Sequence, residues 1–312
     1  MKDKRTTLRA VAITAAILSI ILELTYPAYS DSVKYPVLGL CLLLIGIPHG
    51  AIDHIVTSKL YNLSQTISDQ AKFYIYYLVM MTIMTSIWII NPLSGFLVFA
   101  FLTIYHFGQA DLEHLDINKN IKRLLFLSRG SMIMGLIIIS DLQYTSPILL
   151  DLTGINILEQ ISGASIHNTL LAVLPLQYLV IQTATLMYYK FQASDIIYIL
   201  FDAFIVAALF LIVNPILAFA IYFGLWHSAG HVKEMMSYFE KTGIKMNLKS
   251  FYLKALPLNL ITLIGIGLIY WISQTYQFEL QIVSLLFIII SVLTLPHMLI
   301  VEKMYSRSSS LG

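Results

Sequence analysis

The sequence predicts an all-α protein: a polytopic integral membrane helix bundle of about ten transmembrane helices, with both termini in the cytoplasm. Three observations predict it. Apolar residues make up 58% of the chain and charged residues only 12%, and mean hydropathy is +0.80, whereas a soluble domain carries about 25% charged residues. The apolar residues gather into runs long enough to cross a bilayer. Lysine and arginine segregate into alternate loops between these runs.

Each predicted span is an apolar run of roughly the 20 residues that a helix needs to cross the hydrocarbon core. The fourth run is short, and the others approach or exceed this length. In chain order the predicted spans are 8–25, 37–56, 73–91, 95–110, 124–141, 167–190, 195–213, 216–236, 254–272 and 281–301.

Turn and interface residues separate these spans. Asn91-Pro92 lies between the third and fourth, and Asn214-Pro215 between the seventh and eighth, as expected of tight turns. Aromatic residues gather near the ends of the spans, as in an interfacial belt. They include Tyr26, Tyr61, Tyr74, Tyr188, Tyr189, Trp271 and Tyr305.

The basic residues orient the bundle. With ten spans, all of the 19 lysines and arginines except Lys34 and Arg129 fall on one side. The positive-inside rule places that side, with both termini, in the cytoplasm, which predicts a multi-pass protein of the cell membrane. As an alternative, residues 1–30 resemble a signal peptide, with a small-residue cleavage site at Ala28-Tyr29-Ser30.

No polar linker divides the chain, so a single transmembrane domain over residues 1–312 is the simplest expectation. The single cysteine, Cys41, lies in an apolar run, which excludes a disulfide framework and a cysteine metal site. No basic stripe or nucleic-acid motif is present, and no nucleic-acid partner is expected.

Five of the eight histidines lie inside the predicted spans, where an ionisable side chain by default marks a functional site. His49, His106 and His227 each lie about twelve residues into spans that run in the same direction, so they share one depth. His231 follows His227 by one turn, and the H-x-x-x-H spacing aims both imidazoles at one point. His297 lies somewhat deeper on the cytoplasmic side.

A lone buried histidine often does no more than hydrogen-bond a neighbouring backbone. Four at one depth favour a shared metal ion. Near them, Asp53 stands four residues after His49 and could be a ligand. More naturally it orients a ligand through a hydrogen bond, either His49 or a neighbour across the helix interface. Asp111 stands just beyond His106 at the inner boundary.

The remaining histidines are expected outside the cluster. His54 points about 100° away from His49 on a helix, which favours an orienting or structural role. His114 lies in a charged loop, and His167 begins a span at the opposite side of the membrane.

Imidazole-rich sites suit iron, copper or zinc. The absence of H-E-x-x-H argues against an intramembrane metalloprotease. A metal- or proton-coupled transporter remains an alternative, although the histidine intervals show no repeat of the kind that transporters have. A desaturase-like di-iron enzyme would need several short histidine boxes, and one H-x-x-x-H pair is present. A mostly histidine site in a dry, apolar setting suits non-haem Fe(II) that binds O2 beside a lipid-soluble substrate.

Four motifs then resemble the Brp/Blh family of bacterial and archaeal membrane β-carotene 15,15′-dioxygenases, which cleave β-carotene centrally into two retinals. The resemblance covers roughly residues 37 to 301. The motifs are I-P-H-G-A-I-D-H (47–54), Y-H-F-G-Q-A-D (105–111), W-H-S-A-G-H (226–231) and L-P-H (295–297).

The resemblance implies an oxidoreductase with Fe(2+) as cofactor and with β-carotene and O2 as substrates. It implies that His49, His106, His227 and His231 are the catalytic iron ligands. A retinal acceptor such as a microbial rhodopsin is an implied downstream partner, and an oxygenase acting on another isoprenoid or lipid would keep the same iron site. Five residues are expected to orient ligands or to line the substrate pocket: Asp53, His54, Asp111, Trp226 and His297.

Overall fold

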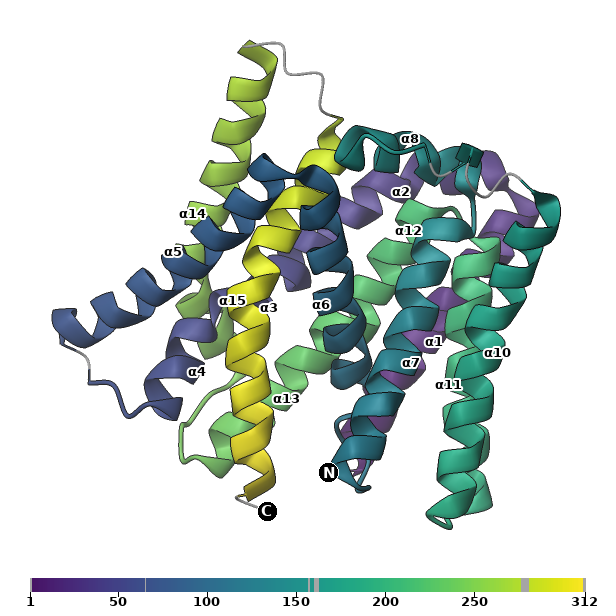
Figure 1. Cartoon of the computed structure of the whole chain (residues 1–312). Helices are drawn as coiled ribbons and strands as arrows, with labels where there is room; N and C mark the ends of the chain where they lie inside the picture. The colour runs from purple at the N-terminus through teal and green to yellow at the C-terminus, as the bar shows by residue number, and fades with distance from the viewer. Residues whose placement is uncertain (1, 65, 157, 160–162, 276–280, 311–312) are drawn as a thin grey trace. The chain divides into compact units, whose positions relative to one another are not determined.

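The computed structural model describes residues 2–64, 66–156, 158–159, 163–275 and 281–310, and these ranges are almost entirely helical, with no strand (Figure 1). The all-α prediction is therefore confirmed. The helices, with η denoting a π-helix, are α1 (Lys2–Thr25), α2 (Pro27–Cys41), η1 (Leu42–Gly46), α3 (Ile47–Ala51), α4 (Asp53–Leu60), α5 (Ile67–Ile90), α6 (Pro92–Leu112), α7 (Lys119–Ile139), α8 (Leu142–Thr153), α10 (Ala164–Tyr188), α11 (Ala193–Ile212), α12 (Pro215–Ile221), η2 (Tyr222–Ser228), α13 (Ala229–Lys241), α14 (Leu248–Thr275) and α15 (Ile282–Ser310).

Among the described residues, eight helical stretches are long and apolar enough to cross a membrane, or nine if the bent pair α7–α8 forms one span. The multi-pass character is confirmed, while ten spans were predicted. One difference lies in residues 216–236, which comprise α12, η2 and part of α13, each shorter than a span. The other is the 97° bend between α7 and α8. The orientation of the termini stays a prediction.

The chain forms two compact units. The first comprises Met1–Leu42, Thr103–Pro147 and Asn156–Gly230, and the second comprises Leu43–Leu102, Ile148–Ile155 and His231–Gly312. Neither unit is a continuous stretch of sequence, and helices α6 and α8 each contribute residues to both. We therefore keep a single transmembrane domain over residues 1–312 as a proposal.

In the first unit, α1 packs against α2, α11 and η2, while α7 packs against α10 and α11 (Figure 1). Two small residues of α1, Ala12 and Ala16, are fully buried, which allows close helix approach. The Glu23 carboxylate accepts hydrogen bonds from the Ser30 hydroxyl (2.6 Å) and from the Asn214 backbone N–H (3.2 Å). Glu23 thereby ties α1 to the start of α12, which is buried at every residue.

The two Asn-Pro pairs predicted as turns begin helices. The Asn91 side-chain oxygen accepts from the Ser94 backbone N–H, and that of Asn214 accepts from the Ile216 N–H. Asparagine caps the first exposed N–H groups of a helix, and proline fits the first helical position. These pairs therefore set where α6 and α12 start.

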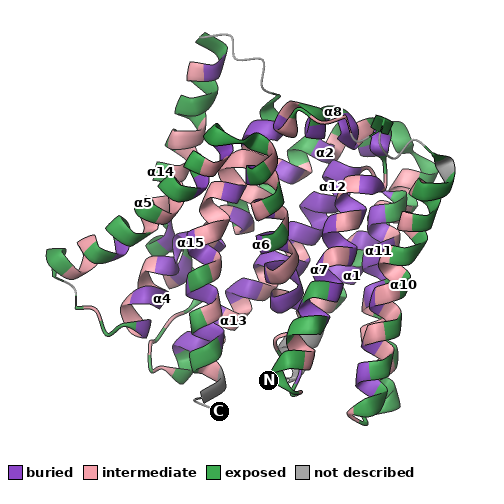
Figure 2. Ribbon diagram, viewed as in Figure 1, coloured by how far each residue is buried: buried purple, intermediate pink, exposed green. Residues whose placement is uncertain are grey.

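In the second unit, α15 packs against α4 and α5, and α14 packs against α3. One apolar core includes Ile52, Phe239 and Phe251, all of them fully buried. Large apolar side chains such as Ile261 and Ile264 are instead exposed along α14, whose outer surface is largely uncovered (Figure 2). An exposed apolar face of this kind is suited to a lipid environment.

Candidate metal centre

Three buried histidines come together in the second unit. His49 of α3, His231 of α13 and His297 of α15 are 6%, 1% and 5% exposed. Their ring centroids lie 4.9 Å (His49–His297), 5.3 Å (His231–His297) and 5.7 Å (His49–His231) apart. A ring nitrogen of His231 lies within 4.8 Å of one of His297. Three segments far apart in sequence therefore bring imidazoles to one point.

A carboxylate holds one of these rings. The Nδ1 atom of His297 lies 2.9 Å from Oδ2 and 3.0 Å from Oδ1 of Asp53, which is 1% exposed. The Tyr77 hydroxyl donates a third hydrogen bond to Asp53, at 3.3 Å. The Asp53 carboxylate of α4 thus contacts His297 of α15, a neighbour on another helix.

His49 is positioned by an irregular helix. The π-helix η1 ends at Gly46, and the Gly46 carbonyl oxygen accepts a hydrogen bond from Nδ1 of His49. Pro48 has no N–H to donate toward Leu44, and the Tyr252 hydroxyl instead donates to the Leu44 carbonyl at 3.0 Å. Short π-helical segments occur frequently at functional sites. With Nδ1 committed to the backbone, Nε2 of His49 is the nitrogen suited to coordination.

The first unit holds a second pair of buried histidines. His106 of α6 and His227 of η2 have ring centroids 4.8 Å apart and are 2% and 1% exposed. Phe107 lies 4.6 Å from the His227 ring, and Phe223 stacks on it at 5.5 Å. His227 is therefore surrounded by aromatic side chains that keep its environment apolar.

Two glycines let α6 approach α7 at this point. A Cβ atom added at Gly108 would lie 1.9 Å from the Phe126 carbonyl oxygen, and one at Gly130 would lie 1.7 Å from that of Ile104. Side chains at either position would force the helices apart. The glycine of H-F-G (106–108) is thus explained by backbone contact beside His106.

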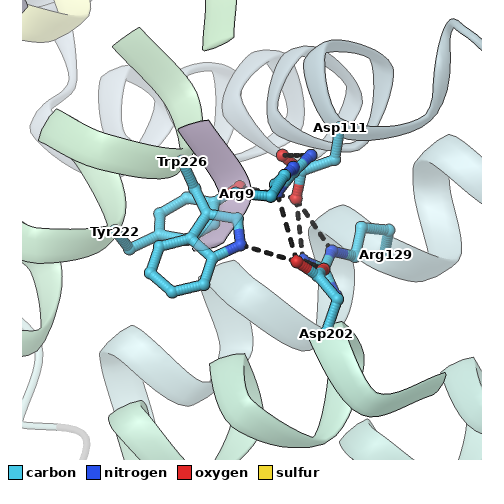
Figure 3. A network of polar contacts seen from close by, with 6 residues as sticks. All are labelled: Arg9, Asp111, Arg129, Asp202, Tyr222 and Trp226. Carbon is cyan, nitrogen blue, oxygen red and sulfur yellow. Dashed lines mark hydrogen bonds and ion pairs between the residues drawn. The ribbon is translucent and has the colours of Figure 1, made fainter. Parts of the chain in front are cut away.

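A network of four charged side chains lies in the same unit (Figure 3). The Arg129 guanidinium lies 2.9 Å from Asp111 and 3.1 Å from Asp202, and Arg9 of α1 lies 3.3 Å and 3.4 Å from the same carboxylates. Two positive and two negative charges balance, as burial requires. Asp111 therefore belongs to this charge network.

Two aromatic residues of η2 complete the network (Figure 3). The Trp226 indole N–H donates to Asp202 at 2.9 Å, and the Tyr222 hydroxyl donates to Asp111 at 3.3 Å. Trp226 directly precedes His227 in the sequence. The charge network thereby fixes the part of η2 that carries the candidate ligand His227.

The donor set fits a metal ion. Nitrogens of buried imidazoles are ligands for iron, copper or zinc. One ring is held by a carboxylate and another by a backbone carbonyl, which are the outer contacts that metal-binding histidines ordinarily make. Buried histidines of the second unit, His231 and His297 among them, could therefore bind a metal.

Comparison with known proteins assigns the family. The family model described as β-carotene 15,15′-dioxygenase matches residues 40–305. The chain belongs to the β-carotene 15,15′-dioxygenase family. It is 24% identical over 281 residues to the β-carotene 15,15′-dioxygenase of an uncultured marine bacterium (66A03), an alignment that covers 86% of the chain and 93% of that relative.

A second relative is the probable β-carotene 15,15′-dioxygenase Blh of Halobacterium salinarum, which is 24% identical over 315 residues. That alignment covers 94% of the chain and 90% of the relative. No solved structure matches the chain. The predicted family membership is confirmed. The matched residues 40–305 include the five histidines that were predicted to lie within spans, and they exclude Arg9.

Three histidines of this dioxygenase family member were predicted to lie outside the cluster. Two contact backbone carbonyls, and the third is exposed. His54 is half-buried, with Nδ1 3.0 Å from the Ala51 carbonyl and its ring facing Phe73. Nε2 of His167 lies 2.7 Å from the Ile139 carbonyl, and His114 is exposed.

Sequence reasoning missed several polar residues near the candidate ligands. They are Arg9, Tyr77, Asp202 and Tyr222, while Arg129 was noted without a role. Asp202 and Arg129 were detectable, because a charge inside an apolar span seeks a partner of opposite sign. Arg9 and the two tyrosines carry no comparable signal in the sequence.

Proposed function

We propose that this family member cleaves β-carotene at its central 15,15′ double bond, with Fe(II) and O2, to give two molecules of all-trans-retinal. The observation that carries the proposal is the family match over residues 40–305, in a chain whose buried histidines fit a metal. The relatives' names support a carotenoid as substrate. The apolar spans support action in a lipid bilayer, which we take to be the cell membrane.

In this proposal His49, His106, His227 and His231 hold the iron. All four are buried, and they occupy the histidine positions of the P-H-G, H-F-G and W-H-x-x-x-H motifs. His227 and His231 also lie one turn apart along the chain, where η2 continues into α13. Neutral imidazoles leave the bound ion cationic, and bound ferrous iron would supply the activation of O2.

The overall reaction balances with O2 as the sole co-reactant. The 15,15′ carbon–carbon double bond breaks, two carbonyl groups form, and each receives one oxygen atom of O2. No proton has to enter or leave. The protein's task is accordingly to orient the polyene and to exclude water, and no acid or base is needed.

Several side chains are suited to these tasks. Phe107 and Phe223 cover the His227 ring and offer an apolar surface to a polyene. The charge network fixes Trp226 through Asp202, and Trp226 is itself 2% exposed. Retinal is poorly soluble in water, so a membrane acceptor such as a microbial rhodopsin is a fitting downstream partner.

Expression in bacteria that make β-carotene tests the proposal. Cells with the intact chain should lose orange colour and accumulate retinal, measured by chromatography, while the His227→Ala and His49→Ala variants should accumulate none. The exposed His114→Ala variant is the matched control and should retain most activity. Both inactive variants must still be present in the membrane fraction.

Metal analysis of the purified protein supplies the second arm. The proposal expects iron in near-equal amount to protein. Stoichiometric zinc without iron would contradict the iron assignment. Undiminished retinal formation without O2 would contradict an oxygenase, and full activity in either histidine variant would remove that residue from the ligand set.

A further inference from the structure

The second unit contains a histidine whose surroundings differ from those expected of a pocket residue. His297 lies on α15, in the L-P-H motif, and was expected to orient a ligand or to line the substrate pocket. Its ring is 5% exposed and lies 4.9 Å from that of His49 and 5.3 Å from that of His231. Both neighbours are proposed ligands, so His297 shares their immediate environment.

The hydrogen bonds of His297 determine which of its nitrogens can coordinate. Both oxygens of Asp53 lie within 3.0 Å of Nδ1, so the proton of a neutral His297 resides on Nδ1. The lone pair is then on Nε2, at the opposite edge of the ring. A carboxylate that accepts a hydrogen bond from the distal nitrogen is the usual companion of a metal-bound histidine, because it fixes the tautomer and raises ligand basicity.

The spacing of the rings suits a common ion. Metal–nitrogen bonds of about 2.1 Å separate two ligand atoms on one ion by no more than about 4.2 Å. Ring nitrogens of His231 and His297 already lie within 4.8 Å of each other. The His49 and His297 rings are nearly perpendicular, at 87°, and are therefore not stacked on one another. A small inward movement would bring the His231 and His297 nitrogens to bonding distance.

The carboxylate itself is held in place. Asp53 is 1% exposed and accepts a further hydrogen bond from Tyr77 of α5. A buried carboxylate needs a compensating positive charge or several donors. A metal ion bound to His297 would supply such a charge one ring away from the carboxylate, without protonation of the imidazole.

We propose that His297 is itself a ligand of the metal ion, through Nε2, and that Asp53 is the positioning residue that orients it. This inference rests on the proposed function for the presence of a metal and deepens it by adding a ligand. His49, His231 and His297, with Asp53 behind the last, then form a coordinating group within the second unit. The metal has a protein ligand beyond the four that the family resemblance implies.

The test counts imidazoles directly. The full-length protein and its His297→Gln variant are loaded with Fe(II), and X-ray absorption spectra are fitted for the number of coordinated histidines. Glutamine keeps a polar side chain near Asp53 but has no imidazole. We expect one coordinated histidine fewer in the variant and an iron affinity lower by more than about tenfold, in the range seen for altered metal shells.

A second variant and a control distinguish the loss of a metal ligand from a general effect of substitution. His297→Ala should show the same loss of one imidazole, and His114→Ala should match the intact protein in both measurements. Unchanged imidazole count and iron affinity in both His297 variants, with only a raised KM for β-carotene, would overturn the inference in favour of a pocket role. Failure of the proposed function is separate, because it would appear as absent iron or absent retinal formation in the intact protein.

Discussion

The Nδ1 atom of His297 lies 2.9 Å from Oδ2 of Asp53, although 244 residues separate them in the sequence. This contact joins the D of I-P-H-G-A-I-D-H to the H of L-P-H within one unit. It gives a physical reason for an aspartate that follows the histidine of the P-H-G motif. Asp53 begins α4, whereas His49 lies in the preceding helix α3.

Replacing Asp53 by asparagine should weaken iron binding by about 10- to 100-fold, because outer partners of metal ligands typically contribute that much. Tyr77→Phe removes a single hydrogen bond to the same carboxylate, so its effect should be smaller. Titration of the metal-free protein with Fe(II) measures both. Unaltered affinity in Asp53→Asn would show that this carboxylate does not act through a ligand.

Gly108→Ala should destabilise the protein by about 1–3 kcal/mol or more, since the added methyl group would overlap the Phe126 carbonyl. Thermal unfolding in detergent measures the loss. Gly265→Ala is the matched control, because nothing lies within 4 Å of a Cβ there. Equal stability of the two variants would refute the close approach of α6 and α7.

Arg129→Met should cost about 3–5 kcal/mol, because it leaves the two carboxylates of Asp111 and Asp202 to share the single positive charge of Arg9. Adding Asp202→Asn restores charge balance with Arg9, and the double variant should be more stable than Arg129→Met alone. Arg123→Met alters an exposed arginine of the same helix and should change stability by less than about 0.5 kcal/mol. Additive losses in the double variant would contradict the coupling of these charges.

The purified protein should retain residues 1–30. Arg9 contributes to the charge network, and Glu23 accepts hydrogen bonds from Ser30 and Asn214. Cleavage after Ser30 would leave Asp111 and Asp202 with a single arginine. The intact mass of the membrane-extracted protein measures this, and a mass that lacks the first thirty residues would favour the signal-peptide alternative.

The sequence predicted those features that depend on local composition. Apolar run length identified the helical, multi-pass architecture, and the rarity of histidine in such runs singled out His49, His106, His227, His231 and His297. The span count differed where the chain departs from the regular α-helix. Neither the π-helix at Tyr222–Ser228 nor the 97° bend between α7 and α8 has a sequence signature as plain as an apolar run.

Long-range pairing was beyond sequence reasoning. Arg9 and Asp202 are 193 residues apart, and no pattern in either segment indicates that the two side chains pair. Asp53 was expected to serve His49 or a neighbour across the helix interface. The i+4 relation to His49 assumes one continuous helix, but Ile52 separates α3 from α4 with a backbone conformation of φ −90°, ψ −2°. The hydrogen-bond partner of Asp53 therefore required the fold.

The most direct measurement is the fate of labelled oxygen in a single reaction. Purified protein is stripped of metal, reloaded with Fe(II) and given β-carotene under ¹⁸O2, and the retinal is reduced at once so that its oxygen cannot exchange with water. We expect two molecules of retinal for each β-carotene consumed, both labelled, and none from the metal-free protein. Unlabelled retinal, or retinal formed equally well without iron, would contradict iron-dependent dioxygenase activity.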